Sequence, residues 1–227
     1  MRRTTDEPLP LAWLARLAGQ AMALYLRLVA ATARFSGPPI FQGQAVFAVW
    51  HESNLVAAAS AVRLRWDRRI VSFSTRGLRG IMMSTMLGSL GMGALTLPDE
   101  GSATRAEAGR LSLELARMAG SGRSLVVSCD GPFGPYRVAK PGVLLVAREA
   151  GVAIQPWAIV SRPAWRLWGR WDRHLVPLPF SRMRVVEGTR IEVAPHERIK
   201  PLLAGLQAEL ERVAAVADRE MAGRRVP

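Results

Sequence analysis

The sequence has few of the residues that bind metals or form disulfides. Its 227 residues include one cysteine, Cys129, and only three histidines. A single cysteine excludes an internal disulfide and fits a reducing compartment, and the histidines, without a cysteine pair, show no zinc-ligand spacing. No internal repeat, low-complexity tract or Gly/Ser linker divides the chain. We therefore expect one domain, with enough apolar residues for a single large core.

Acidic residues are also scarce. The chain has 31 Lys and Arg residues against 18 Asp and Glu, which gives a formal net charge of +13. This balance predicts an anionic partner: nucleic acid, an anionic membrane surface, or a phosphorylated or carrier-bound substrate. The basic residues are mostly scattered arginines with few aromatic residues between them, a pattern that disfavours nucleic acid. We therefore expect no nucleic-acid partner.

Residues 1–40 are predicted to form an amphipathic helical arm ahead of an α/β domain at residues 41–227. Acidic residues and prolines precede the apolar stretch, so we reject a secretory signal peptide. Residues 9–35 contain Arg16, Arg27 and Arg34, and a full membrane span would carry two of these arginines, at roughly 2.5–3.5 kcal/mol each near the centre of a bilayer. The favoured interpretation is a helix lying in the membrane interface. The alternative is a core helix packed on the sheet.

Apolar runs and helical segments alternate along the rest of the chain. We expect strands at residues 44–50, 69–73, 94–97, 124–128 and 154–160, a hairpin-like pair at 183–186 and 190–193, and helices at 52–63, 80–90, 103–118, 142–150 and 199–222. Strands separated by helices of this length predict an α/β fold with a mixed, largely parallel sheet flanked by helices on both faces.

The most informative stretch follows the strand at 124–128. The apolar run stops at Asp130 and passes into a Gly/Pro loop that carries Gly131, Arg137 and Lys140. Glycine allows a ligand to approach the backbone closely, and backbone N–H groups near Gly131 are candidate donors to an oxyanion. Cys129, next to Asp130, is interpreted as a small buried filler rather than a nucleophile.

His51 and Arg76 also follow predicted strands closely. In a parallel sheet, ligands bind beyond the carboxyl ends of the strands, so we expect these residues to converge with Asp130 there. A neutral imidazole is suited to take a proton from a hydroxyl, and a carboxylate from Asp130 or Glu52 would orient it. Arg76, Arg137 and Lys140 are the candidates for holding a phosphate.

Several motifs in residues 45–195 resemble the lysophospholipid acyltransferase-like superfamily (glycerolphosphate acyltransferase type), and within it the bacterial branch known as domain-of-unknown-function family 374. The residues that carry the resemblance are Trp50-His51, Cys129-Asp130-Gly131-Pro132, Gly134-Pro135, Lys140-Pro141-Gly142, 153–157 and 171–182. The resemblance implies a sheet wrapped by helices and a membrane-touching N-terminal arm.

The same resemblance implies an activity. Members transfer an acyl group from acyl-CoA or acyl-carrier protein to a hydroxyl of a lysophospholipid or related lipid acceptor, with a histidine base and without a metal or other cofactor. For this chain it implies an O-acyltransferase with His51 as base, bound to an anionic membrane surface at the cytoplasmic face of the inner membrane.

The sequence departs from the superfamily at two positions. The acid expected five residues after the histidine is Val56, and the arginine expected in the phosphate motif is Phe133. The later Glu187-Gly-Thr-Arg190 is interpreted as a turn. These departures leave open a second hypothesis, a catalytically degenerate lipid-binding protein of the same fold. Four methionines, Met82, Met83, Met86 and Met92, either line an acyl tunnel or belong to the core.

Overall fold

The structure is a computed structural model that describes residues 9–37, 43–65, 69–97, 110–111, 113–115, 117–118 and 121–223. Its helices are α1 (Leu9–Thr32), η1 (His51–Ser53), α2 (Asn54–Arg63), α3 (Gly77–Ser89), α5 (Gly142–Ala150) and α6 (Ile199–Gly223). Its strands are β1 (Arg34–Ser36), β2 (Val46–Val49), β3 (Ile70–Ser74), β4 (Gly93–Thr96), β5 (Ser124–Ser128), β6 (Ile154–Arg166) and β7 (Leu175–Glu187).

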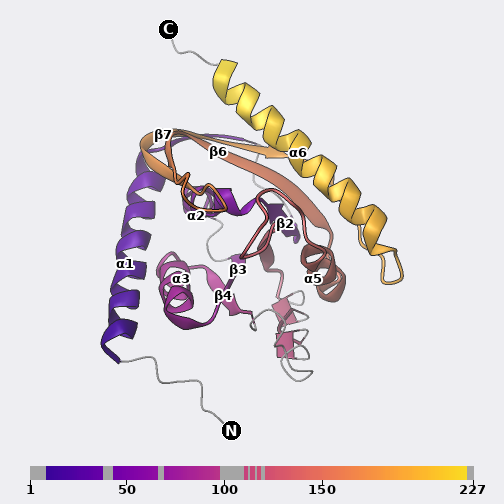
Figure 1. The fold of residues 1–227 in the computed structure, drawn as a ribbon, viewed down its shortest axis with the longest axis horizontal. Coiled ribbons are helices and arrows are strands. Elements are labelled where there is room, and N and C mark those ends of the chain that lie inside the picture. Colours follow the sequence, from indigo (N-terminus) through magenta and orange to yellow (C-terminus); the bar gives the residue numbers. More distant parts are fainter. Residues whose placement is uncertain are drawn as a thin grey trace.

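These strands form one seven-stranded sheet in the order β1-β7-β6-β2-β5-β3-β4 (Figure 1). All neighbouring strands are parallel except β6 and β7, which are antiparallel. Helices cover both faces of the sheet, so the prediction of a mixed, largely parallel α/β fold is confirmed.

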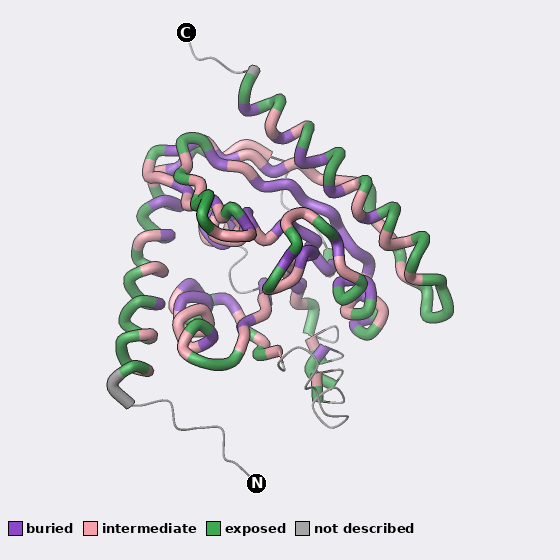
Figure 2. Tube along the Cα trace, viewed as in Figure 1, coloured by how far each residue is buried: buried purple, intermediate pink, exposed green. Residues whose placement is uncertain are grey.

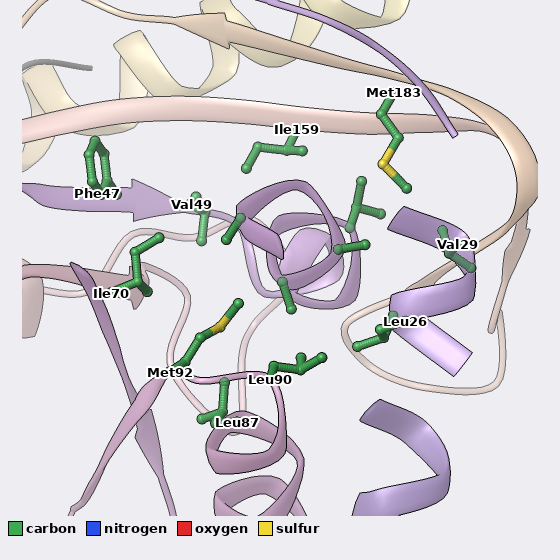
Figure 3. Packing of buried hydrophobic residues seen from close by; sticks show 14 of the residues in the cluster. Leu26, Val29, Phe47, Val49, Ile70, Leu87, Leu90, Met92, Ile159 and Met183 are labelled. Carbon is green, nitrogen blue, oxygen red and sulfur yellow. The ribbon is translucent and has the colours of Figure 1, made fainter. Parts of the chain in front are cut away.

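The central strand β2 divides the apolar core into two parts. All its residues are buried, and they alternate: Phe47 and Val49 join the cluster with α1, α2 and α3, whereas Val46 and Ala48 join the cluster with α5 and α6. Figure 3 shows part of the first cluster, which includes Met183 of β7. This alternation follows from the period of two along a strand, and it explains why a strand buried on both faces reads as a continuous apolar run.

Helix α1 has two different faces. Its inner face belongs to the core, where Leu26 and Val29 are fully buried and Gly19 lies so close to α3 that an added Cβ would be 2.4 Å from the carbonyl oxygen of Met82. The helix leaves six large apolar side chains exposed: Leu11, Trp13, Leu14, Leu17, Leu24 and Leu28. Figure 2 shows exposed and buried positions alternating along the trace of α1. The inner face therefore fits the core-helix interpretation, and the outer face is free to contact a membrane.

By length and composition alone, the 22 residues Leu11–Thr32 are apolar enough to cross a membrane. The packing against α3 nevertheless places one side of this segment inside the protein.

The pair β6–β7 differs from the expectation. The strands predicted at 154–160 and 183–186 are parts of two strands of 13 residues each that pair with one another. Their register shifts between Arg162 and Ala164, which accommodates Pro163, a residue that cannot donate to the ladder. The predicted strand at 190–193 is wrong, because only Ile191 forms a bridge, to Ile154. Most of the helix predicted at 103–118 lies outside the described residues.

Two further sequence interpretations have structural outcomes. Met86 and Met92 are buried in the apolar cluster, with Met83 packed against it, which matches the core interpretation. The Glu187–Arg190 segment is not a defined turn, because Glu187 is the last residue of β7 and residues 188–190 are irregular backbone. There Gly188 N–H donates to the carbonyl oxygen of Pro156 at 2.8 Å.

Candidate active site

His51 and Asp130 meet at the carboxyl edge of the sheet. Strands β2 and β5 are parallel neighbours with Val49 opposite Ser128, so the residues that follow them emerge side by side. The backbone N–H of His51 donates to Oδ1 of Asp130 at 2.9 Å, and the N–H of Cys129 donates to the carbonyl of Val49 at 2.8 Å. The expected convergence of His51 and Asp130 is therefore present.

The Asp130 carboxylate binds backbone rather than imidazole. Its Oδ1 accepts the His51 N–H, and its Oδ2 accepts the Arg137 N–H at 3.2 Å. The side chain is fully buried, and this burial raises its pKa to about 6 against the lowering effect of these backbone bonds. Asp130 thus fixes the 130–140 loop to the start of η1, which corrects the expectation that it orients the His51 ring.

Glu52 is also occupied elsewhere. Its carboxylate is buried and accepts hydrogen bonds from the hydroxyl of Tyr136 at 2.8 Å and from the guanidinium groups of Arg137 and Arg166. It therefore joins η1 to the 130–140 loop and to the end of β6. Glu52 is the centre of an ion-pair network and does not orient the imidazole.

The carboxylate that faces the His51 ring is Asp172, which lies in the connection between β6 and β7. Its Oδ2 is 3.7 Å from Nε2 of His51 and 3.3 Å from Nδ1 of His174. Arg170 holds both oxygens through hydrogen bonds of 2.9 and 2.8 Å. Sequence reasoning missed this role, although Asp172 lies within the 171–182 motif that carried the family resemblance.

Opposing effects set the ionisation of these groups. Burial lowers the pKa of His51 to about 4, and the charges of His174, Arg170 and Arg79 act in the same direction, whereas Asp172 raises it. Burial raises the pKa of Asp172. The hydrogen bond from Arg170 and the charges of His174, Arg170 and His51 lower the pKa by more, so it lies below its ordinary value. At neutral pH the site holds a neutral His51 imidazole beside the Asp172 carboxylate.

The exposed part of the His51 ring lies away from Nδ1. The side chain is 23% exposed, but Nδ1 is buried and has no hydrogen-bond partner among the described residues. Trp171 lies beside the imidazole, with ring centroids 5.3 Å apart, and also packs against Gly134, where an added Cβ would be 2.5 Å from the indole. Nδ1 is therefore closed to a substrate, and Nε2 is the nitrogen that faces Asp172.

The four predicted binding residues have different environments. The Arg137 guanidinium is bound to Glu52, so it is not available to hold a phosphate. The Lys140 side chain lies over Gly131, where an added Cβ would be 3.0 Å from Lys140 Cδ, and the Gly131 N–H donates to the carbonyl of Ser128 at 3.2 Å. Arg76 is exposed and directly precedes α3.

Cys129 has the environment expected of a buried filler. It is fully buried, and burial together with the charge of Asp130 raises the pKa of its thiol well above the ordinary value. The thiol stays protonated and is a poor nucleophile.

His51, Asp172 and His174 form a group that could hold a metal ion in the described part of the chain. Each offers one ligand atom, and these atoms lie within 4.8 Å of one another. Arg170 already donates to both carboxylate oxygens of Asp172, so a cation placed there would compete with a guanidinium charge.

Comparison with known proteins gives a distant relative. The chain is 22% identical over 172 residues to a protein of Rickettsia prowazekii (strain Madrid E) named "Uncharacterized protein RP090", covering 74% of this chain and 75% of that protein. No protein-family description matches the chain. The comparisons therefore assign neither a family nor a reaction.

Proposed function

We propose that the protein is an O-acyltransferase that moves a fatty acyl group from acyl-CoA or acyl-carrier protein to a hydroxyl of a lysophospholipid or related lipid. The observation that carries the proposal is the partly exposed, neutral His51 imidazole at the carboxyl edge of the sheet, with Nε2 3.7 Å from the Asp172 carboxylate. A neutral imidazole beside a carboxylate is suited to general-base catalysis on a hydroxyl.

In the proposed step, Nε2 of His51 takes the proton of the acceptor hydroxyl while the oxygen attacks the carbonyl carbon of the thioester. The tetrahedral intermediate then collapses, the C–S bond breaks, and the leaving thiolate recovers the proton from the imidazolium. The products are the lipid ester and the free thiol of coenzyme A or the carrier protein. The step uses no cofactor besides this co-substrate and forms no covalent acyl-enzyme.

Asp172 would act by its charge. The distance of 3.7 Å from Nε2 is longer than a hydrogen bond, so Asp172 does not hold Nε2 through one. As the base, the neutral ring would carry its proton on Nδ1 and its lone pair on Nε2. When the ring becomes positively charged, a carboxylate about 4 Å away stabilises it by about 4 kcal/mol at an effective dielectric constant of about 20. The positive charge of Arg170 offsets part of this stabilisation.

The same geometry suggests how substrates are held. The outer face of α1 would lie on an anionic membrane surface with its exposed leucines among the lipid chains and Arg16 toward the headgroups. Lys140 and Arg76 remain the candidates for a substrate phosphate, now without Arg137. We propose the cytoplasmic face of the inner membrane as the location, since a reducing compartment also fits the single cysteine.

The test measures acyl transfer from labelled acyl-CoA and acyl-carrier protein to a panel of lysophospholipids. His51→Ala should reduce transfer to background, whereas His196→Ala, an exposed histidine in the loop before α6, should leave it unchanged. Thermal unfolding checks that both variants fold. Transfer that persists in His51→Ala contradicts the proposal.

Asp172→Asn provides the sharper comparison. We expect kcat to fall about 100-fold, since half or more of the stabilisation by Asp172 survives the offset from Arg170. An unchanged kcat would contradict the role given to Asp172. No transfer by the wild-type protein with any donor or acceptor, together with retained binding to anionic vesicles, would instead favour the catalytically degenerate lipid-binding protein.

A further inference from the structure

Three arginines stand in one row across neighbouring strands, outside the cluster around His51. Arg34 of β1 is the register partner of Arg182 of β7, and Arg182 is the partner of Arg162 of β6. Residues directly opposite one another in a sheet project from the same face, with Cβ atoms about 4.5–5.5 Å apart in antiparallel pairs. The fold therefore brings three positive charges together from segments far apart in the sequence.

The same arginines line a cavity of about 480 Å³. Its other walls come from Thr32 at the end of α1, from Pro163 and from Phe180. Phe180 is 77% exposed and has a left-handed backbone with φ 61°. This conformation is costly for a residue with a side chain, and such strain is concentrated at binding sites.

Asp218 compensates little of the charge of Arg162. Oδ1 of Asp218 is 3.9 Å from a guanidinium nitrogen of Arg162, and both side chains are about half exposed, which makes this a weak pair. The neighbouring Glu220 is paired with Arg184 at 2.6 Å. Like charges directly opposite one another destabilise a sheet, and an anion between them would remove that repulsion.

We propose that the row Arg34–Arg182–Arg162 binds a phosphate group. Guanidinium groups match phosphate oxygens in pairs, which favours phosphate over a small halide ion. Phe180 and Pro163 supply an apolar wall for the part of the ligand that carries the phosphate. The group can belong to a lipid headgroup or to a soluble phosphate ester. This inference is independent of the proposed acyl transfer, because it uses none of the residues around His51.

The first arm of the test uses soluble ligands and the full-length protein. Inorganic phosphate and glycerol phosphate are titrated at constant ionic strength while thermal unfolding is followed by circular dichroism. The wild-type melting temperature should rise, and Arg182→Gln should bind about tenfold more weakly, the effect of losing one charge-assisted contact. Arg63→Gln, an exposed arginine at the end of α2, is the control.

The second arm distinguishes a lipid headgroup from a free phosphate. Binding to phosphatidylcholine vesicles with and without phosphatidylglycerol is measured for the same variants by co-sedimentation. Arg182-dependent binding to the anionic vesicles without a response to soluble phosphate assigns the site to a headgroup, and a response to soluble phosphate assigns it to a phosphate ester. If Arg182→Gln does not fold, Arg162→Gln replaces it. Identical behaviour of the wild type, the row variant and Arg63→Gln in both arms would overturn the proposal.

Discussion

Replacing Glu52 by Gln should destabilise the fold by about 3 kcal/mol. The buried carboxylate accepts hydrogen bonds from Tyr136, Arg137 and Arg166, whereas Gln has no charge and would turn its own NH₂ donors toward the guanidinium groups. Breaking a buried ion pair costs about 3–5 kcal/mol. The lower end applies because the Arg137 and Arg166 side chains keep 29% and 25% of their exposure to water.

Urea unfolding followed by circular dichroism measures this loss. With an m-value of about 3 kcal/mol per molar urea, the midpoint should fall by about 1 M. The control is Glu192→Gln, whose carboxylate is 76% exposed and pairs with Arg190, so its removal should cost less than about 1 kcal/mol. Equal midpoints for the two variants would refute the reasoning.

A double-mutant cycle with Arg166→Gln locates the loss. Because Arg166 and Glu52 are in direct contact, we expect a coupling energy of about 1 kcal/mol or more. Additive effects would show that Glu52 does not join the end of β6 to η1.

Three further changes test other parts of the structure. Gly19→Ala should cost about 2 kcal/mol in urea unfolding because its Cβ would meet the backbone of Met82, whereas Gly205→Ala, with open space around it on α6, should be neutral or stabilising. Between pH values of about 6.5 and about 4 the unfolded chain protonates His51 and the folded protein does not, so its contribution to stability falls as the pH drops. As the pH falls through this window, the unfolding free energy of the wild type should therefore decrease relative to that of His51→Gln. A difference between the two proteins that does not change with pH would contradict the lowered pKa of His51. The Leu24 side chain on α1 is 71% exposed, so Leu24→Ser should weaken binding to anionic vesicles about tenfold without changing stability. The control Leu145→Ser, at an exposed position on α5, should leave vesicle binding unchanged.

The sequence alone predicted the alternation of strands and helices and the position of His51. Those features depend on local periodicity, because a strand buried on both faces reads as an apolar run and an amphipathic helix repeats its apolar residues every three to four positions. His51 and Asp130 each directly follow such a run, and parallel strands end at the same edge of the sheet. Their convergence therefore followed from the order of elements.

Sequence could not show which carboxylate faces the imidazole. Asp130 is close to His51 in space, but its oxygens are used by backbone N–H groups. Asp172 reaches the ring only because the long β6–β7 pair folds its connecting segment back over the sheet edge, where Arg170 fixes the carboxylate. The direction of a side chain depends on this packing and not on the residue's distance along the chain.

The burial of one face of α1 and the alignment of three arginines both depend on tertiary structure. The sequence of α1 favoured a membrane-interface helix over a core helix, and packing against α2, α3 and β7 decided which side is buried. Arg34, Arg162 and Arg182 are scattered in the sequence, and strand register aligned them. Local sequence determined which elements form, because their periodicity is local. Tertiary structure decided which side chains meet, because register and packing join segments that are distant in the chain.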